Sequence, residues 1–498
     1  MPTKATTLFH LCLALPVLLL LGFGPGVPSL ADPSPADQVK DTIDKALAHP
    51  YMARGFQGVH VVSMDTGKVI YDHYGDHLLT PASCMKIIVT STALDLLGPD
   101  YKMTTSLYAA AAPEDGVVKG DLILVGRGDS VLKIEDLKQM VDKLKAMGVT
   151  KIKGNIVGDE TYFEGTSIGI GCDPDDEAYY YATPVSALSL NKNYIDTFIR
   201  PGAKVGDPAV VEIKPATSYF TVKNECVTGP AKSASTADTT RLRAENVVLA
   251  TGSIPVDSKP TDPIEQLSME KPALFTVTIL KELLEKNGVR VKGKAVLGTK
   301  PAQAELIASH DSPPLSEIVN ILNKPSDNFM AESLLKTLGK EIKGKGTFDA
   351  GIEVEKDWLR KIGADMDAIR IADASGLSRR DSISPQNLTT VLTHMYHTRN
   401  YGILSNSFPI AGVDSHLKDR MLNTPAVNNV KAKTGYVSLV CSLSGYVTTL
   451  AGENLAVSII QNNHTCSLDE ANVIQDIIFV ALSKITTRTD AVASPAAK

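Results

Sequence analysis

Hydrophobic and polar positions alternate near the N-terminal end of the chain and then change to a helical period. Two β-type runs, 58–63 and 68–71, flank an Asp/Gly turn at 65–67, which predicts a hairpin. The apolar series from Met85 to Leu97 then has helical spacing, and Gly98 ends it. Thr80 is a suitable N-cap for this helix, with proline next to it at the first helical position.

The C-terminal part of the chain reverses this order, with helices first and strands afterwards. Helical patterns occupy 315–323, 325–340, 347–362 and 385–398; β runs at 430–441, 444–450 and 455–461 predict a meander, and a last helix covers 468–483. One antiparallel sheet flanked by helices can collect both ends. The pattern therefore predicts an α/β (α+β) domain made of residues 32–98 plus 306–485.

The segment between these two parts, residues 99–305, has a different character. It is rich in Gly and Asp and in short β runs such as 121–125 and 154–157, and 200–258 looks almost wholly β. One helical pattern covers 272–287. We expect a large, mostly β insertion that forms sub-domains of its own.

The two termini look like segments outside the folded domains. Lys4, an apolar run over 8–21 and the small residues before 32 predict a signal peptide over 1–31, cleaved after Ala31, and hence an exported protein of the periplasm or cell envelope. An uncleaved membrane anchor is the alternative. Residues 32–40 read as a linker, and 486–498 as a disordered tail.

Charge and cysteine content exclude several classes of function. The net charge of −6 gives no electrostatic reason to expect nucleic acid or anionic lipid as a partner. Five cysteines follow the predicted signal; Cys172 and Cys226 are one conceivable bridge, and the connectivity stays open. Because no CxxC pair is present, a thiolate zinc site is not expected.

The first chemical motif is the pair Ser83 and Lys86, three residues apart at the start of the predicted helix. Such residues share a helix face, and a lysine with a lowered pKa can take the serine proton. The same spacing recurs elsewhere, so spacing alone decides nothing; the other pairs are Ser130/Lys133, Ser189/Lys192, Ser268/Lys271, Ser333/Lys336 and Ser415/Lys418. Only the first pair places its serine in the first turn of a strongly signalled helix, where backbone N–H groups can face an oxyanion.

Two further motifs lie far along the chain. Ser326-Asp327-Asn328 precedes a helix; it can relay a proton and hold a peptide group, although it also reads as a simple N-cap. Lys433-Thr434-Gly435 lies on a predicted strand, where the first two residues can grip a carboxylate and the glycine allows close approach of a substrate backbone. In this order the three motifs form the signature of penicillin-binding proteins and serine β-lactamases.

Around these motifs the chain resembles the low-molecular-mass class C penicillin-binding proteins, the D-alanyl-D-alanine carboxypeptidase/endopeptidase family. The likeness covers roughly 55–480. Its stretches are 79–86, 120–129, 158–163, 184–189, 328–332, 373–378, 433–435 and 443–446. The two motif serines lie about 240 residues apart, which leaves room for an insertion that no β-lactamase has.

The resemblance implies a role for each motif residue. Ser83 would be acylated with Lys86 as its base, and Ser326 would protonate the leaving D-alanine nitrogen. The substrate-binding residues would be Asn328, Lys433, Thr434, Gly435 and Tyr436, with the N–H groups of Ser83 and Tyr436 forming the oxyanion hole. Peptidoglycan stem peptides would be the substrates and β-lactams covalent inhibitors, with no metal or organic cofactor. Tyr436 departs from the family, which usually has threonine after this glycine.

Other functions are compatible with parts of the same pattern. A serine β-lactamase would turn penicillin over rapidly, and a catalytically weak cell-wall scaffold would bind without releasing D-alanine. The glycine–serine–glycine pattern at 165–169 resembles a hydrolase elbow, but a loop-like segment follows it. The sequence leaves open whether carboxypeptidase or endopeptidase action dominates. It also leaves open whether the protein attaches peripherally to a membrane or associates with itself.

Overall fold

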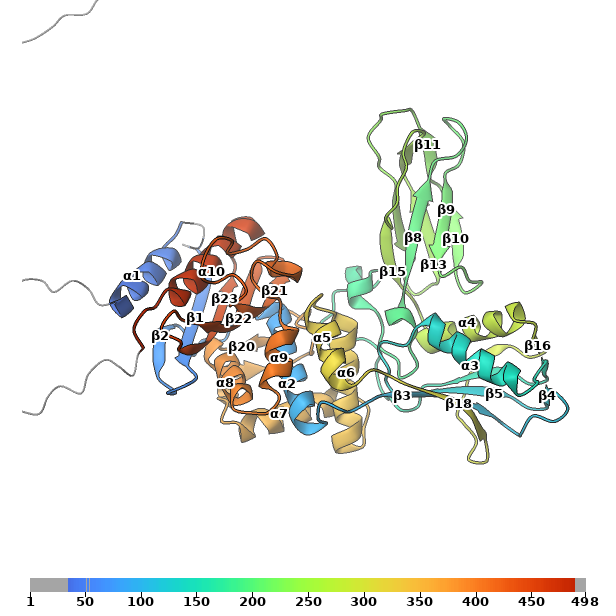
Figure 1. The fold of residues 1–498 in the computed structure, drawn as a ribbon. Helices are drawn as coiled ribbons and strands as arrows, with labels where there is room; N and C mark the ends of the chain where they lie inside the picture. The colour runs from blue at the N-terminus through green and yellow to red at the C-terminus, as the bar shows by residue number, and fades with distance from the viewer. Residues whose placement is uncertain (1–34, 51, 53, 489–498) are drawn as a thin grey trace, which may run out of the picture.

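A five-stranded antiparallel sheet joins the two ends of the chain. The computed structural model describes residues 35–50, 52 and 54–488, so the predicted signal peptide and most of the predicted tail lie outside the described residues. The strands are β1 (Phe56–Ser63), β2 (Val69–His73), β21 (Lys431–Val437), β22 (Val440–Thr448) and β23 (Asn454–Asn462), in the order β2-β1-β23-β22-β21. β1 runs antiparallel to β23, with Val61 opposite Val457 (Figure 1). The predicted hairpin, meander and shared sheet are confirmed.

Both faces of this sheet are covered by helices. On β23, Val457 and Ile459 join the core formed with α1 (Pro35–Leu47) and α10 (Leu468–Ser483). The alternate residue Ile460 joins the core on the opposite face, which contains α8 (Pro385–Tyr396). Because successive side chains of a strand point to opposite faces, a strand covered on both faces is buried at almost every position, as β23 is.

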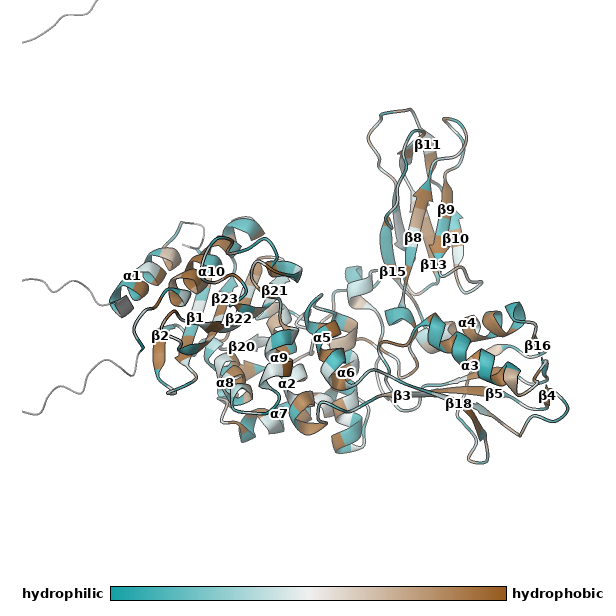
Figure 2. Cartoon of the chain, in the orientation of Figure 1, coloured by the Kyte–Doolittle hydropathy of each residue, from teal (hydrophilic) through white to brown (hydrophobic). Residues whose placement is uncertain are grey.

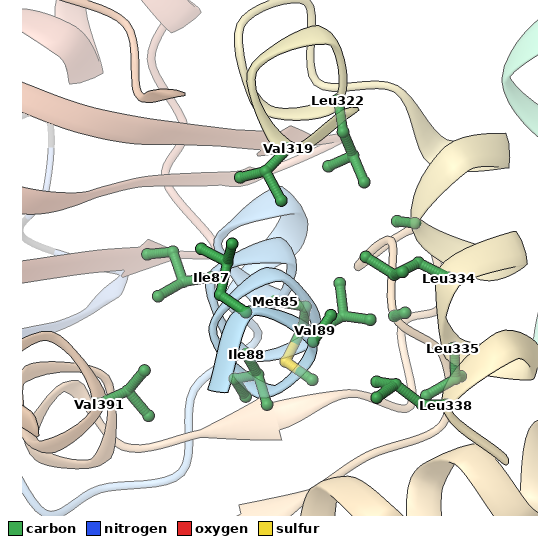
Figure 3. Close-up of a cluster of buried hydrophobic side chains, with 14 of the residues drawn as sticks. Met85, Ile87, Ile88, Val89, Val319, Leu322, Leu334, Leu335, Leu338 and Val391 are labelled. Atoms are coloured by element: carbon green, nitrogen blue, oxygen red, sulfur yellow. The ribbon is translucent and has the colours of Figure 1, made fainter. Parts of the chain in front are cut away.

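Helix α2 (Lys86–Leu96) is the centre of the helical layer. Figure 3 shows side chains of α5 (Leu315–Asn323), α6 (Asn328–Lys343) and α8 directed toward it. Ile87, Ile88 and Val89 are all fully buried, as expected of a helix that is apolar all round. α7 (Phe348–Lys361), α9 (Tyr401–Ser407) and the short strands β19 (Ile369–Arg370) and β20 (Ser382–Ile383) complete this part of the fold.

The start of this helix differs from the sequence prediction. A 3-10 turn, Ala82–Met85, precedes α2, and no side chain caps it. The backbone of Thr80, the predicted cap, pairs instead with the side chain of Asn462. The amide N–H of Thr80 donates to Asn462 Oδ1 at 2.7 Å, and Asn462 Nδ2 donates to the Thr80 carbonyl oxygen at 2.9 Å. The prediction failed because Thr80 is held by the last sheet strand rather than by its own helix.

The prediction of a linker over 32–40 is also wrong for residues 35–40, the part of this segment that the structure describes. α1 begins at Pro35, and its Ile43 and Leu47 are buried beside α10. A short helix is only marginally stable alone, so this packing rather than local composition stabilises α1.

The insertion, residues 99–311, contains a second five-stranded sheet of order β17-β7-β5-β3-β18. Its strands are β3 (Thr104–Ala109), β5 (Leu122–Gly126), β7 (Ile156–Asp159), β17 (Ala295–Leu297) and β18 (Glu305–Asp311). Helices α3 (Ile134–Ala146) and α4 (Pro272–Lys286) share its core, and β4 (Val117–Val118), β6 (Lys151–Ile152) and β16 (Arg290–Val291) form a small separate sheet. The boundary expected at residue 306 needs correction: it falls inside β18, whose pairing with β3 keeps the chain in the insertion to residue 311.

The arm, residues 194–268, extends away from the rest of the insertion (Figure 1). Its strands are β8 (Tyr194–Arg200), β9 (Val210–Lys214), β10 (Thr221–Asn224), β11 (Val227–Gly229), β12 (Asp238–Arg241), β13 (Val247–Thr251), β14 (Ser253–Pro255) and β15 (Glu265–Ser268). The β-rich segment expected at 200–258 is therefore longer at both ends. Figure 2 shows polar and apolar residues along these strands. Cys172 and Cys226 are free thiols, so the bridge considered between them is not formed.

Candidate active site

The three motifs line one cleft of about 1350 Å³. Its walls are the 3-10 turn before α2, the start of α6, the edge strand β21 and segments of the insertion. Six of the predicted site residues line it, namely Ser83, Ser326, Asn328, Thr434, Gly435 and Tyr436. The other two, Lys86 and Lys433, are fully buried, and their ammonium nitrogens contact the motif serines. The structure thus brings together residues from three distant stretches of the chain.

Lys86 is held by three oxygen acceptors. Its Nζ lies 2.9 Å from Ser83 Oγ, 2.7 Å from Asn328 Oδ1 and 2.6 Å from the carbonyl oxygen of Ser375. Burial lowers the pKa of Lys86 to about 8, against the opposing effect of the carboxylates of Asp373 and Glu332. A neutral amine is therefore accessible close to neutral pH, next to a serine hydroxyl.

Lys433 makes an equivalent contact with the second serine. Its Nζ lies 2.8 Å from Ser326 Oγ and 2.7 Å from the carbonyl oxygen of Thr434. Burial and the neighbouring charge of Lys86 lower the pKa of Lys433 to about 7. Ser326 has φ +64°, a conformation that L residues other than Asn and Asp rarely adopt. Two serine–lysine pairs therefore face the same cleft.

Gly435 allows β21 to lie directly against the turn that carries Ser83. A Cβ atom at Gly435 would lie 2.6 Å from the carbonyl oxygen of Pro81 and 2.9 Å from the amide nitrogen of Ser83. Any other residue would push the strand away from this turn. The next residue, Tyr436, is about half exposed and stands at the mouth of the cleft.

Sequence reasoning assigned no role to the turn 373–378, which supplies the Ser375 carbonyl to Lys86. Gly376 has φ +77°, and a Cβ atom there would clash with the carbonyl oxygen of Ala82 at 1.8 Å. This turn is therefore packed against the backbone immediately before Ser83. The glycine in Asp373-Ala374-Ser375-Gly376 was the available signal, although a backbone carbonyl contact has no signature in the sequence.

The insertion also reaches the site. The carbonyl oxygen of Tyr181 accepts a hydrogen bond from Asn328 Nδ2 at 2.9 Å. Lys192 Nζ lies 2.7 Å from the carboxylate of Asp327, the middle residue of the second motif. These contacts could not be predicted from the sequence, because they join segments more than a hundred residues apart.

The competing patterns do not form a second site. In the Ser333/Lys336 pair, Ser333 Oγ donates to the carbonyl of Gly128, whereas Lys336 Nζ donates to the carbonyl of Thr166. The pattern at 165–169 lies in an irregular segment and not at a strand-to-helix elbow. Among the described residues, no group of three or more His, Cys, Asp or Glu side chains is arranged to hold a metal ion.

A serine hydroxyl in contact with a buried lysine, a second serine–lysine contact and a glycine-bearing edge strand are the arrangement of a serine acyl-transferase site of the penicillin-binding type. Comparison with known proteins agrees with this class. The profile of the D-Ala-D-Ala carboxypeptidase 3 (S13) family matches residues 39–484, and the chain belongs to this family of serine peptidases.

Individual relatives support the assignment. The chain is 36% identical over 473 residues to a D-alanyl-D-alanine carboxypeptidase of Actinomadura sp. (strain R39), covering 92% of this chain and 87% of the relative. It is 27% identical to D-alanyl-D-alanine carboxypeptidase DacB of Haemophilus influenzae, covering 79% of this chain and 82% of the relative. The crystal structure of penicillin binding protein 4 (dacB) from Haemophilus influenzae is similar with a TM-score of 0.79 at 25% identity, covering 89% and 99%. The predicted fold class, the family and the enzyme class are confirmed.

Proposed function

We propose that this protein cleaves peptidoglycan stem peptides that end in D-Ala-D-Ala, through an acyl-enzyme formed on Ser83. The observation that carries the proposal is the 2.9 Å contact between Ser83 Oγ and the fully buried Lys86 Nζ, at the floor of an open cleft. A buried lysine with a lowered pKa is the kind of base that a serine nucleophile needs at neutral pH.

Acylation follows from the positions of these groups. Neutral Lys86 takes the Ser83 proton as Oγ attacks the penultimate D-Ala carbonyl, and the N–H groups of Ser83 and Tyr436 bind the oxyanion. When the C–N bond breaks, Ser326 gives its proton to the leaving D-alanine nitrogen and is reprotonated from Lys433, which lies 2.8 Å away. Water then attacks the ester carbonyl and its proton passes to Lys433, which the first step left neutral. Lys86 returns its proton to Ser83 Oγ as the acyl C–O bond breaks, which frees the shortened peptide and restores both lysines.

Substrate recognition uses the strand edge and the amide of the second motif. Lys433 and Thr434 bind the terminal carboxylate, and Asn328 binds a backbone group of the substrate. A bound carboxylate favours the charged form of Lys433, because an opposite charge nearby raises the pKa of an ammonium group. A β-lactam presents a carbonyl and a carboxylate in the same relation, so we propose that it acylates Ser83 as well. The solved Haemophilus influenzae relative has also been determined complexed with a β-lactam.

The cellular location is part of the proposal. The pattern of residues 1–31 supports export and cleavage after Ala31, which would place the enzyme beside its substrate in the periplasm or cell envelope. Within the described residues, no helix combines the length and hydropathy needed to cross a bilayer.

A fluorescent penicillin tests the proposal directly. Ser83→Ala should abolish covalent labelling and D-alanine release from a D-Ala-D-Ala peptide, since no other group supplies the acylated oxygen. Ser333→Ala is the matched control, because Ser333 belongs to a decoy pair whose lysine binds elsewhere. Labelling that survives in Ser83→Ala would refute the proposal. A label that is lost by hydrolysis within seconds would instead indicate a β-lactamase, and labelling without D-alanine release a binding protein.

A further inference from the structure

A group of buried carboxylates lies behind the Lys86 ammonium and has no role in the steps above. Glu332 lies one turn after Asn328 on α6, so both residues project from one face of that helix. Asn328 contacts Lys86 Nζ directly. Glu332 is nearly fully buried, and one of its oxygens, Oε2, has no hydrogen-bond partner among the described residues.

The other oxygen of Glu332 holds the turn that faces Lys86. Glu332 Oε1 accepts hydrogen bonds from the amide nitrogens of Ala374 at 3.0 Å and Ser375 at 2.8 Å. The carbonyl of Ser375 in turn accepts from Lys86 Nζ at 2.6 Å. One carboxylate is thus connected to the ammonium through a single residue of backbone.

The same turn is fastened at its other end. Asp373 accepts hydrogen bonds from the amide nitrogens of Gly376 at 2.6 Å and Ser378 at 2.8 Å. Since Gly376 lies against the carbonyl of Ala82, a displacement of this turn would move both the acceptor of Lys86 and the backbone next to Ser83. The turn is therefore a wall of the site with little freedom to adjust.

From this geometry we propose that Glu332 is a positioning residue for Lys86. Its carboxylate holds the Ser375 carbonyl against the ammonium and sets the electrostatic field that Lys86 experiences. The inference rests on the proposed role of Lys86 as the base. An ionised Glu332 stabilises the protonated lysine, whereas a protonated Glu332 leaves the lysine freer to become neutral.

The charged groups around Glu332 are unbalanced in favour of acids. Two lysines face Glu332, namely Lys86 from α2 and Lys336 from the next turn of α6. The acids that face it are Asp373 in the turn, with Asp381 behind it, and Glu355 on α7. The thiol of Cys172 faces it from the cleft wall. Burial and the charge of Asp373 raise the pKa of Glu332 to about 8, so Glu332 gains its negative charge in the same pH range in which Lys86 becomes neutral. Glu355 is fully buried, and burial raises its pKa well above the usual range.

Glu332→Gln separates the electrostatic effect from the structural one, because it keeps the side-chain shape and an acceptor oxygen and removes the charge. The measurement is the rate of Ser83 acylation by a fluorescent penicillin on the whole protein, from about pH 5 to about pH 9. In the unsubstituted protein the rate falls as pH drops through the pKa of Lys86, near 8, because only neutral lysine accepts the proton. In Glu332→Gln the pKa of Lys86 is lower, so this fall should move by about 1 pH unit to lower pH.

Two further variants complete the test. Glu355→Gln is the matched control: the Glu355 oxygens have no hydrogen-bond partner among the described residues and burial already favours its protonated form, so the fall should stay where it is in the unsubstituted protein. Glu332→Ala removes both hydrogen bonds to the turn and should slow acylation roughly tenfold across the range. A Glu332→Gln profile that coincides with that of the unsubstituted protein, or unchanged acylation in Glu332→Ala, overturns the inference. The proposed function fails separately, if Ser83→Ala is still labelled.

Discussion

The sheet that joins the chain ends is antiparallel throughout, whereas the arm of the insertion has both antiparallel and parallel strand pairs, and the two regions are also covered differently. Every residue of β23 except Asn454 is buried, whereas all four residues of β10 in the arm are exposed. The central sheet is covered by helices on both faces, and the arm encloses only a small core around Ile199 and Ala250. Packing on both faces fixes the strands of this sheet, whose edge strand β21 holds Lys433 fully buried and Thr434 at the cleft.

The insertion contributes to the site by reaching in from its edge. Asn191, Lys192 and Asn193 have φ of +49°, +56° and +59° in succession, just before the first strand of the arm. The buried Asn193 side chain holds this left-handed turn by donating to the carbonyl of Pro184 and to Ser189 Oγ, both at 2.9 Å. The turn places Lys192 against Asp327, whose other carboxylate oxygen accepts from the amide of Met330 and caps α6. The insertion thus supports the second motif without supplying its reacting groups.

The largest effect is expected on the central sheet itself. Lys433→Ala removes the buried ammonium that contacts Ser326 and, in our proposal, the substrate carboxylate. Turnover of a free-carboxylate D-Ala-D-Ala peptide should fall about a hundredfold. Steady-state kinetics of D-alanine release measure this, and a peptide amidated at its C-terminus should lose less. Turnover that stays unchanged would contradict the carboxylate clamp.

A matched pair of valines tests the difference in packing. Val457 is fully buried in β23, and Val222 is exposed in β10. Val457→Ala should lower the apparent free energy of unfolding by about 2 kcal/mol, since it removes buried methyl groups and leaves a cavity. Val222→Ala should change it by no more than about 0.5 kcal/mol. Urea unfolding is followed by the fluorescence of Trp358, a buried residue of α7 whose Nε1 donates to Asp95 of α2. Equal effects would mean that the two regions do not differ as their burial indicates.

The smallest effect is expected where the insertion meets the site. Lys192→Met removes the ion pair with Asp327 and keeps most of the apolar side chain. Because the pair is partly exposed and Asp327 still caps α6, kcat should fall only about threefold, with little change in KM. Lys192→Arg is the control that keeps the charge and should retain activity. A loss as large as that in Lys433→Ala would show that the insertion takes part in the chemistry.

Several elements could be predicted from the sequence because their signals are local. The α5 and α10 helices begin and end at the predicted residues, and α10 has a capping box of Ser467 and Glu470. The three motifs were found because a side-chain hydroxyl, amine or amide is visible in the sequence. α1 was missed, since its Ile43 and Leu47 are stabilised only by contact with the distant α10.

The residues of the site that were missed share one property. The carbonyl oxygens of Ser375 and Tyr181 contact Lys86 and Asn328, and any residue type supplies a carbonyl. Glu332 is visible as an acid on a helix, but its role depends on the turn at 373–378 lying beside it. Neither spacing nor composition carries such information.

The sequence by itself determined which side chains are chemically competent and which local elements hold them, because hydroxyl–amine spacing, helix caps and strand alternation are properties of neighbouring residues. Only the tertiary structure decided that Lys86 and Lys433 are buried within one cleft, that Ser326 is held at positive φ and that Glu332 lies behind the ammonium. Burial and charge proximity are long-range properties of the folded chain, and they set the pKa values on which a serine–lysine site depends.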